Sequence, residues 1–408
     1  MNRLQSNSAK MKIESAKEIG FSDIKIDNAK KIPISAAISY DNLGNEFTGI
    51  RKTNFSSTID NALFLNDQIN VNYSANLDDP NDEKDLRSIG ASISIPYKYN
   101  LFSYDYSRTT YMGQNPGINA PIVINGYSHR NNFSVDRTLL NNTNYRISTN
   151  LSLTKKDSAN YLNGTKIESN DKKLTIGSLS FSFSKFFKNG ANIFLKPQYS
   201  KGITALNSDQ DKGDLSGDIP KAQFQLYKLY ARISKEIQIP KIDIPVTLST
   251  EMDSQFSEDT LYGSEQFSVG GYYSVRGFRE NYITGDNGYY FRNKASFNLG
   301  QILSPIFNSK NEVVSGAEKK LGNNKFYKNI SNSLYKINVE PFYDYGYARN
   351  RFSGDSGRLS GAGLKTIYSD KYFDASLSYS WAIQKSNLIT SQEKENKMLY
   401  FELSLKCC

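Results

Sequence analysis

Cysteine and histidine are almost absent from this chain of 408 residues. Its two cysteines, Cys407 and Cys408, are adjacent, and its one histidine, His129, follows the segment INGYS, where we expect a loop. Adjacent cysteines rarely form a disulfide with each other, so no disulfide framework is predicted. One histidine is too few for a zinc site or a His-based catalytic site. The sequence therefore predicts no metal, no cofactor and no enzymatic activity.

Long apolar segments are also missing. No stretch approaches 18 consecutive apolar residues, which argues against a transmembrane helix. Hydrophobic residues make up 38% of the chain and aromatic residues 13%, with 28 Tyr, 23 Phe and 1 Trp. A compact soluble enzyme normally has more aliphatic residues and fewer tyrosines. The first twenty residues contain no apolar signal core, so we expect any export leader to lie outside this chain.

The formal net charge is +9, but it is not gathered in one region. The 50 Lys and Arg residues are scattered among 41 Asp and Glu residues, and no basic run with interleaved aromatics stands out. This pattern is typical of solvated loops, and we expect no nucleic-acid partner.

Apolar and polar residues alternate along most of the chain. In residues 65–77, Leu65, Ile69, Val71, Tyr73 and Ala75 share one side, while asparagine, glutamine and serine occupy the other. A period of two residues indicates a β-strand with one apolar face and one small polar face. The same pattern recurs in residues 89–95, 145–153, 179–187, 223–233, 374–381 and 399–405.

Two architectures accommodate such strands, a transmembrane barrel and a β-sandwich such as a soluble lectin. The strands are long, and brief turns alternate with long polar loops at 155–173, 202–220 and 308–328. That asymmetry favours an antiparallel outer-membrane barrel, and a spacing of about 23 residues per strand gives about 16 strands. We predict an all-β barrel over residues 33–408. The Lys-rich residues 1–32 are interpreted as the end of a small soluble module and a linker.

Several segments resemble, in chain order, the two-partner secretion transporters of the haemolysin secretion/activation (ShlB/FhaC/HecB) family. Residues 39–73 are similar to the first barrel hairpin of that family, and SEQFSVGGYYSVRGFRE (264–280) contains its VRGF motif after a glycine pair. EPFYDYGYA (340–348) and LSGAGLKTIY (359–368) resemble two later strands. Residues 2–26 resemble the tail of the second polypeptide-transport-associated (POTRA) module.

The resemblance implies that the VRGF loop folds back into the barrel, where Arg276 meets Asp344 on the inner wall. A buried guanidinium needs a carboxylate partner, and Arg suits a bidentate contact. The alternative is a surface turn with a solvated arginine. The implied loop residues are Gly270, Gly271, Val275, Arg276, Gly277 and Phe278, with Phe278 and Tyr273 packed against the wall. The supporting positions on the strands are Phe342, Gly346, Gly361 and Gly363.

The family implies an outer-membrane translocator of a Gram-negative bacterium. Such a protein secretes, and in some cases activates, a large unfolded exoprotein such as a haemolysin or adhesin without ATP. Outer-membrane lipid and the barrel assembly machinery would be its other partners. An insertase-like assembly factor and a passive porin are the alternatives. Family members carry a plug helix, a linker and two POTRA modules before the barrel and end in an aromatic residue, whereas this chain has only the end of the second module and ends LKCC.

Three further motifs are rejected as sites. GAGLKT (361–366) lacks the glycine that a phosphate-binding loop requires before its lysine, and we expect a strand there. NSDQDKGDLSGD (207–218) resembles the start of a calcium loop, but counted from Asp209 it has Gly213 at the fifth position and Pro220 at the twelfth, where such a loop needs liganding residues. The Ser-x-x-Lys pattern of SLYK (333–336) is expected by chance in this composition, and we place it on a strand.

Overall fold

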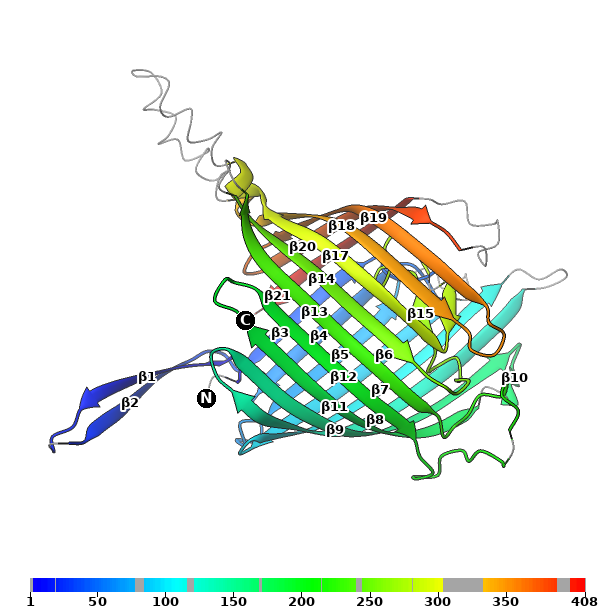
Figure 1. The fold of residues 1–408 in the computed structure, drawn as a ribbon, viewed down its shortest axis with the longest axis horizontal. Coiled ribbons are helices and arrows are strands. Elements are labelled where there is room, and N and C mark those ends of the chain that lie inside the picture. Colours follow the sequence, from blue (N-terminus) through cyan, green and yellow to red (C-terminus); the bar gives the residue numbers. More distant parts are fainter. Residues whose placement is uncertain are drawn as a thin grey trace, which may run out of the picture.

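The computed structural model describes residues 3–18, 20–77, 84–115, 121–168, 171–213, 215–239, 244–280, 282–303, 333–386 and 397–407. Within these ranges, sixteen antiparallel strands form a closed barrel, as predicted (Figure 1). The last strand pairs with the first, from Glu402 opposite Asp41 to Cys407 opposite Ala36. The barrel strands are β3 (Ile34–Asp41), β4 (Lys52–Asp60), β5 (Gln68–Asn76), β6 (Asp85–Tyr97), β7 (Asn100–Asn115), β8 (Ile122–Asn141), β9 (Tyr145–Leu162), β11 (Lys172–Phe186), β12 (Asn192–Gly202), β13 (Gln225–Ile239), β14 (Ile244–Phe256), β17 (Asn287–Asn298), β18 (Ile337–Arg349), β19 (Ser356–Ser369), β20 (Phe373–Gln384) and β21 (Lys397–Cys407).

The two faces of the strands explain the alternation in the sequence. Phe55, Tyr73 and Ile89 are paired across β4, β5 and β6, and all three are exposed on the outside of the barrel. The opposite face carries small polar residues that bond to one another, for example Ser74 Oγ to Asn54 Oδ1 at 2.6 Å. In lipid, an apolar exterior and a polar interior satisfy both surfaces of a barrel wall.

The connections differ between the two rims. At the rim where β3 begins and β21 ends, most are short, such as residues 98–99, 142–144 and 370–372. At the opposite rim they include the long segments 203–224 and 257–286. The expected loop over 155–173 is largely wrong, because β9 continues to Leu162, the short β10 (Thr165–Lys166) pairs back onto it, and β11 begins at Lys172. Residues 308–328 lie outside the described residues.

Two further local predictions are corrected. His129 lies within β8, paired with Arg108 and Asp157 of the neighbouring strands, because β8 is a 20-residue strand that runs past the INGYS segment. Residues 333–336 form a helical turn before β18 begins, not a strand. GAGLKT does lie on a strand, β19.

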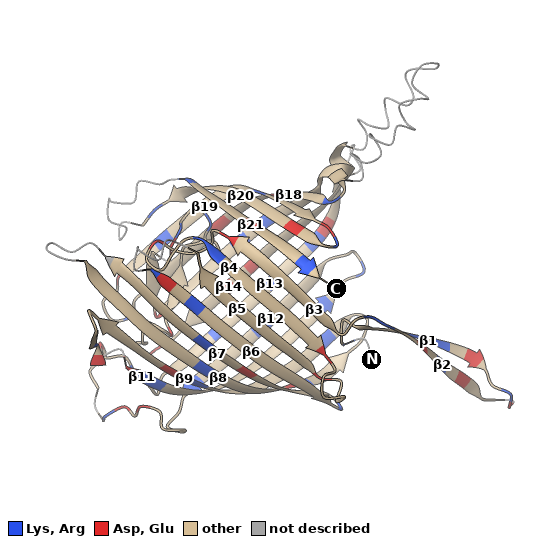
Figure 2. Ribbon diagram, turned by 180° about the vertical axis from the view of Figure 1, so that it is seen from behind, with Lys and Arg blue, Asp and Glu red and all other residues tan. Residues whose placement is uncertain are grey.

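The N-terminal residues form a separate hairpin of β1 (Asn7–Ser15) and β2 (Ser22–Lys30), which projects away from the barrel (Figure 1). Met11 opposes Ile26 and Ile13 opposes Ile24, and all four side chains are exposed. Figure 2 shows acidic and basic residues interspersed along this hairpin and over the barrel strands. Among the described residues, no helix is long and apolar enough to cross a membrane.

Candidate functional site: a loop anchored inside the barrel

The segment between β14 and β17, residues 257–286, turns into the barrel. It contains a small hairpin of β15 (Phe267–Val269) and β16 (Ile283–Gly285), which is seen within the barrel outline in Figure 1. We call residues 257–286 the lumen loop. Its apolar side chains pack against the wall in one buried cluster, which comprises Phe267, Val269, Val275, Phe278 and Ile283 of the loop with Ala348 of β18 and Leu359 of β19.

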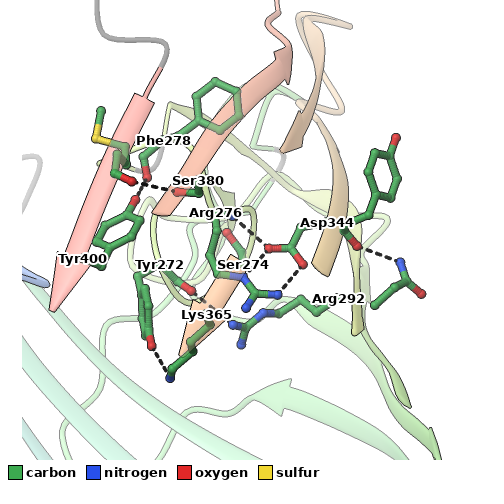
Figure 3. A network of polar contacts seen from close by, with 12 residues as sticks. Tyr272, Ser274, Arg276, Phe278, Arg292, Asp344, Lys365, Ser380 and Tyr400 are labelled. Atoms are coloured by element: carbon green, nitrogen blue, oxygen red, sulfur yellow. Dashed lines mark hydrogen bonds and ion pairs between the residues drawn. The ribbon is translucent and has the colours of Figure 1, made fainter. Parts of the chain in front are cut away.

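Arg276 and Asp344 form the central polar contact of this packing (Figure 3). The Arg276 Nε donates to Asp344 Oδ2 at 2.7 Å, and Nη2 donates to Oδ1 at 2.8 Å. The backbone N–H of Arg276 also donates to Oδ2, at 3.1 Å. Only 4% of the arginine side chain and 0% of the aspartate side chain are exposed. A bidentate pair of this kind fixes both distance and orientation, so Asp344 holds the loop tip in one position.

Phe342 provides a second surface for the same arginine. It lies two residues before Asp344 on the lumen face of β18, and the guanidinium carbon of Arg276 is 3.5 Å from the centre of its ring. A guanidinium over an aromatic face gains electrostatic attraction and packing area together. The segment FYD of β18 therefore supplies both the ring and the carboxylate that receive Arg276.

Three strand glycines make room for this arrangement. A β-carbon at Gly361 would overlap the carbonyl oxygen of Arg276, and one at Gly346 would overlap the side chain of Val269. At Gly363, a β-carbon would lie 2.5 Å from the ring carbon Cζ of Phe342. The wall needs glycine at these positions because loop backbone and buried side chains approach it at van der Waals distance.

The loop tip itself depends on backbone conformations that favour glycine. Gly270, Gly271 and Gly277 have φ values of 125°, 76° and 109°. The Ser274 hydroxyl closes the turn by accepting from the Gly270 N–H at 2.8 Å and donating to the Gly270 carbonyl at 2.6 Å. A β-carbon on Gly277 would stand 2.9 Å from the backbone carbonyl of Trp381 in β20.

The two aromatic residues expected against the wall behave differently. Phe278 is 3% exposed, and its carbonyl accepts a hydrogen bond of 2.5 Å from the Tyr400 hydroxyl of β21. Tyr273 is 64% exposed, so its expected packing against the wall is wrong. It lines a pocket of about 470 Å³ between the loop tip and residues 43–48, and the neighbouring Tyr272 makes the wall contact by accepting from Lys365 Nζ at 2.7 Å.

Several anchors of the loop were not predicted from the sequence. Glu265, near the loop base, forms an ion pair of 2.6 Å with Lys156 of β9. Asp286, which is fully buried, accepts from the backbone N–H groups of Leu261 and Arg351, both at 2.8 Å. No local pattern distinguishes these residues from other charged residues of the chain, because their partners are distant in sequence.

The long connection 203–224 also packs on the loop base. Lys221 forms an ion pair of 2.8 Å with Asp259, and the Thr260 hydroxyl donates to the Gly217 carbonyl at 2.6 Å. Tyr262 packs against the buried apolar cluster beneath, and burial raises the pKa of its hydroxyl. An ion pair and a hydrogen bond therefore join the connection 203–224 to the base of the lumen loop.

The described residues hold no group of three or more His, Cys, Asp or Glu side chains arranged to bind a metal ion. The contacts that hold the loop are hydrogen bonds, ion pairs and apolar contacts. Such contacts fix the position of the loop tip.

A closed antiparallel barrel with an apolar exterior and a loop held in its polar lumen defines an outer-membrane β-barrel protein. The family model described as haemolysin secretion/activation protein ShlB/FhaC/HecB matches residues 20–317. The chain belongs to this family.

Individual relatives agree with the family model. The outer membrane transporter CdiB of Dickeya dadantii (strain 3937) is 31% identical over 304 residues, which cover 74% of this chain and 53% of that protein. The hemolysin transporter protein ShlB of Serratia marcescens is 28% identical over 304 residues, 73% of this chain and 53% of that protein. The chain spans about half the length of these curated relatives.

The solved structure of CdiB from Escherichia coli has the same fold. It superposes with a TM-score of 0.83 at 23% sequence identity and covers 100% of this chain and 69% of that one. The closed barrel excludes the β-sandwich alternative, and the relatives and the fold place the chain in the outer membrane of a Gram-negative bacterium. Family membership favours a transporter over an assembly factor or a porin.

Proposed function

We propose that this chain forms the conducting barrel of a two-partner secretion transporter, which passes an unfolded partner exoprotein outward across the outer membrane. The observation that carries the proposal is a lumen loop held by one bidentate ion pair, in a chain of the haemolysin secretion/activation family. The partner belongs to the haemolysin or adhesin class that such transporters export. The protein moves a polypeptide and catalyses no covalent step, so no enzyme activity is assigned.

The resting barrel is obstructed by its own loop. The tip contacts five consecutive strands, through Arg292 of β17, Asp344 of β18, Lys365 of β19, the Trp381 backbone of β20 and Tyr400 of β21. Passage of a polypeptide therefore requires the tip to shift. Arg276 and Asp344 are the residues that hold the resting position, and Phe342, Gly346, Gly361 and Gly363 shape the wall that receives it.

The rest of the inner surface suits a chain in transit. Small hydroxyl side chains bond across neighbouring strands, such as Ser88 to Thr109 at 3.0 Å and Ser178 to Ser200 at 2.9 Å. Side chains that satisfy each other offer few free donors or acceptors to a passing peptide. Translocation needs no nucleotide, since folding of the exoprotein outside the cell makes its passage irreversible.

The hairpin β1–β2 is the end of the second POTRA module in this proposal. A two-stranded hairpin is only marginally stable alone, and the exposed Met11, Ile13, Ile24 and Ile26 form an apolar face that the remainder of such a module would cover. Residues 1–32 thus join the periplasmic part to the barrel of residues 33–408. Outer-membrane lipid surrounds the barrel, and the barrel assembly machinery inserts it.

Co-expression with a candidate exoprotein of the haemolysin or adhesin class from the same organism tests the proposal. Exoprotein should accumulate in the medium only when the barrel is present. If the exoprotein reaches the medium equally without the barrel, the function is wrong. If depletion of the barrel instead lowers the levels of unrelated outer-membrane proteins, the assembly-factor alternative holds.

A further inference from the structure

Arg292 stands beside the central ion pair without sharing in it. It lies on β17, and its Cα is the direct register partner of Asp344 on β18. Both side chains face the lumen, and Figure 3 shows the Arg292 side chain extending alongside Arg276 and Asp344. Residues that face each other across two antiparallel strands have β-carbons about 5 Å apart. The Asp344 carboxylate is nevertheless bonded to the loop residue Arg276.

The donors of Arg292 are poorly used in this arrangement. Its Nη2 donates to the Tyr272 carbonyl of the loop tip at 3.3 Å, a long bond. Its Nε is shielded from solvent and has no hydrogen-bond partner among the described residues. A buried donor without a partner is unfavourable, and a second cation close to Arg276 adds repulsion, which Glu251, the register partner of Arg292 on β14, offsets only in part because it forms no ion pair with Arg292 among the described residues. The resting state therefore holds Arg292 in an incompletely satisfied position.

Departure of the loop changes both strand residues at once. Asp344 loses the three hydrogen bonds from Arg276, and Arg292 loses the Tyr272 carbonyl. A buried carboxylate left without a partner strongly opposes such a step. Arg292 and Asp344 are already opposite each other on rigid neighbouring strands, so a change of side-chain rotamer is enough to join them.

We propose that Arg292 is a positioning residue that replaces Arg276 as the partner of Asp344 when the lumen loop is displaced. The exchange leaves neither strand charge uncompensated, so the displaced state becomes accessible at thermal energies. Arg292 thereby favours the displaced state of the loop, although it contacts the loop in the resting state. The inference rests on the proposed function, since it concerns the loop shift that translocation requires.

The two roles that Arg292 could have predict opposite results. If Arg292 served only as a clamp on the Tyr272 carbonyl, its loss would free the loop. If it competes for Asp344, the variant Arg292→Gln, which keeps an amide donor and removes the charge, holds the loop more tightly. Lys294→Gln is the matched control, because Lys294 is the next lumen-facing residue of β17 and pairs with Glu340 at 2.8 Å.

Loop displacement can be measured on the purified barrel without any exoprotein. Val275 is fully buried in the resting loop, so the thiol of a Val275→Cys reporter reacts with a maleimide only when the loop moves out. Cys407 and Cys408 are first replaced by serine to remove other thiols. Gel mobility with and without boiling verifies that every variant is a folded barrel.

We expect Arg292→Gln to lower the labelling rate of the Val275→Cys reporter about fivefold to tenfold, the worth of one net intramolecular hydrogen bond, while Lys294→Gln stays within about twofold. Arg292→Lys should recover most of the rate. In an Asp344→Asn background, Arg292→Gln should have less than about a twofold effect. A faster or unchanged rate in Arg292→Gln, or an effect that persists in the Asp344→Asn background, would overturn the proposal. A barrel that shows these labelling rates but secretes no exoprotein contradicts the proposed function instead.

Discussion

Replacing Asp344 by asparagine probes the ion pair with almost no change in side-chain volume. Asp344 is fully buried and accepts three hydrogen bonds from Arg276, at 2.7, 2.8 and 3.1 Å. Asparagine removes the negative charge and presents an N–H₂ group to donors on one side. Breaking a buried ion pair by removing one partner costs about 3–5 kcal/mol.

Breaking the pair destabilises the resting position of the loop by this free energy. In the displaced state Arg276 is hydrated, and the barrel strands keep their backbone hydrogen bonds, so the displaced state is not destabilised in the same way. Since about 1.4 kcal/mol corresponds to a tenfold change in an equilibrium, the lower figure makes the displaced loop roughly a hundredfold more populated. We therefore expect the labelling rate of a Val275→Cys reporter to rise about a hundredfold in Asp344→Asn.

The matched control is Glu340→Gln, the same carboxylate-to-amide change on the lumen face of the same strand. Glu340 pairs with Lys294 of the wall and is 6% exposed. The labelling rate of the Val275→Cys reporter in the Glu340→Gln barrel should remain within about twofold of the rate in the parent barrel. An Asp344→Asn barrel that labels no faster than the Glu340→Gln barrel would refute the reasoning that this pair holds the loop.

Three other predictions follow from separate contacts. Gly361→Ala places a β-carbon on the Arg276 carbonyl, so labelling of the Val275→Cys reporter should rise at least about tenfold while the barrel keeps its heat-modifiable mobility; unchanged labelling would contradict the close approach. Glu265→Gln removes the charged contact with Lys156 at the loop base and should raise labelling by about tenfold or more, as expected for one partly buried charged hydrogen bond. The hydrogen bond from Lys336 lowers the pKa of Asp370, so this contact stabilises the folded turn at neutral pH and is lost as the pH falls through that lowered pKa. Exchange protection of the Ser369 amide, which donates to the Lys336 carbonyl, should therefore drop on acidification in the parent and stay flat in Asp370→Asn.

Much of the fold is readable from the sequence because it depends on a local period. The alternation around Ile69, Val71 and Tyr73 is a property of one strand, and it correctly assigns those residues to the barrel exterior. The same reasoning fails in the two longest strands, β8 and β9. Around His129 and towards the end of β9, polar residues interrupt the alternation, so these segments resemble loops although their backbone continues the ladder.

The loop contacts are less accessible to sequence reasoning. Arg276 and Asp344 are 68 positions apart, and only the family resemblance links them. The ring of Phe342 under Arg276 and the ion pair of Glu265 with Lys156 depend on how the loop enters the lumen, which no period encodes. Arg292 looks like any other polar position of its strand until the register places it opposite Asp344.

Secretion by an Arg276→Ala barrel is the most direct test of the central claim, that this chain is a translocator whose loop is positioned by the Arg276–Asp344 pair. The exoprotein in the medium is quantified for the parent, for Arg276→Ala and for a strain without the barrel, at equal amounts of heat-modifiable barrel in the outer membrane. We expect secretion that depends on the barrel and falls at least about tenfold in Arg276→Ala, because translocation in this account needs the loop to return to the position that Asp344 fixes, and loss of a buried ion-pair partner removes about 3–5 kcal/mol of that hold. Parental levels of exoprotein in the medium of the Arg276→Ala strain would contradict the role of the pair, and parental levels without the barrel would contradict the function itself.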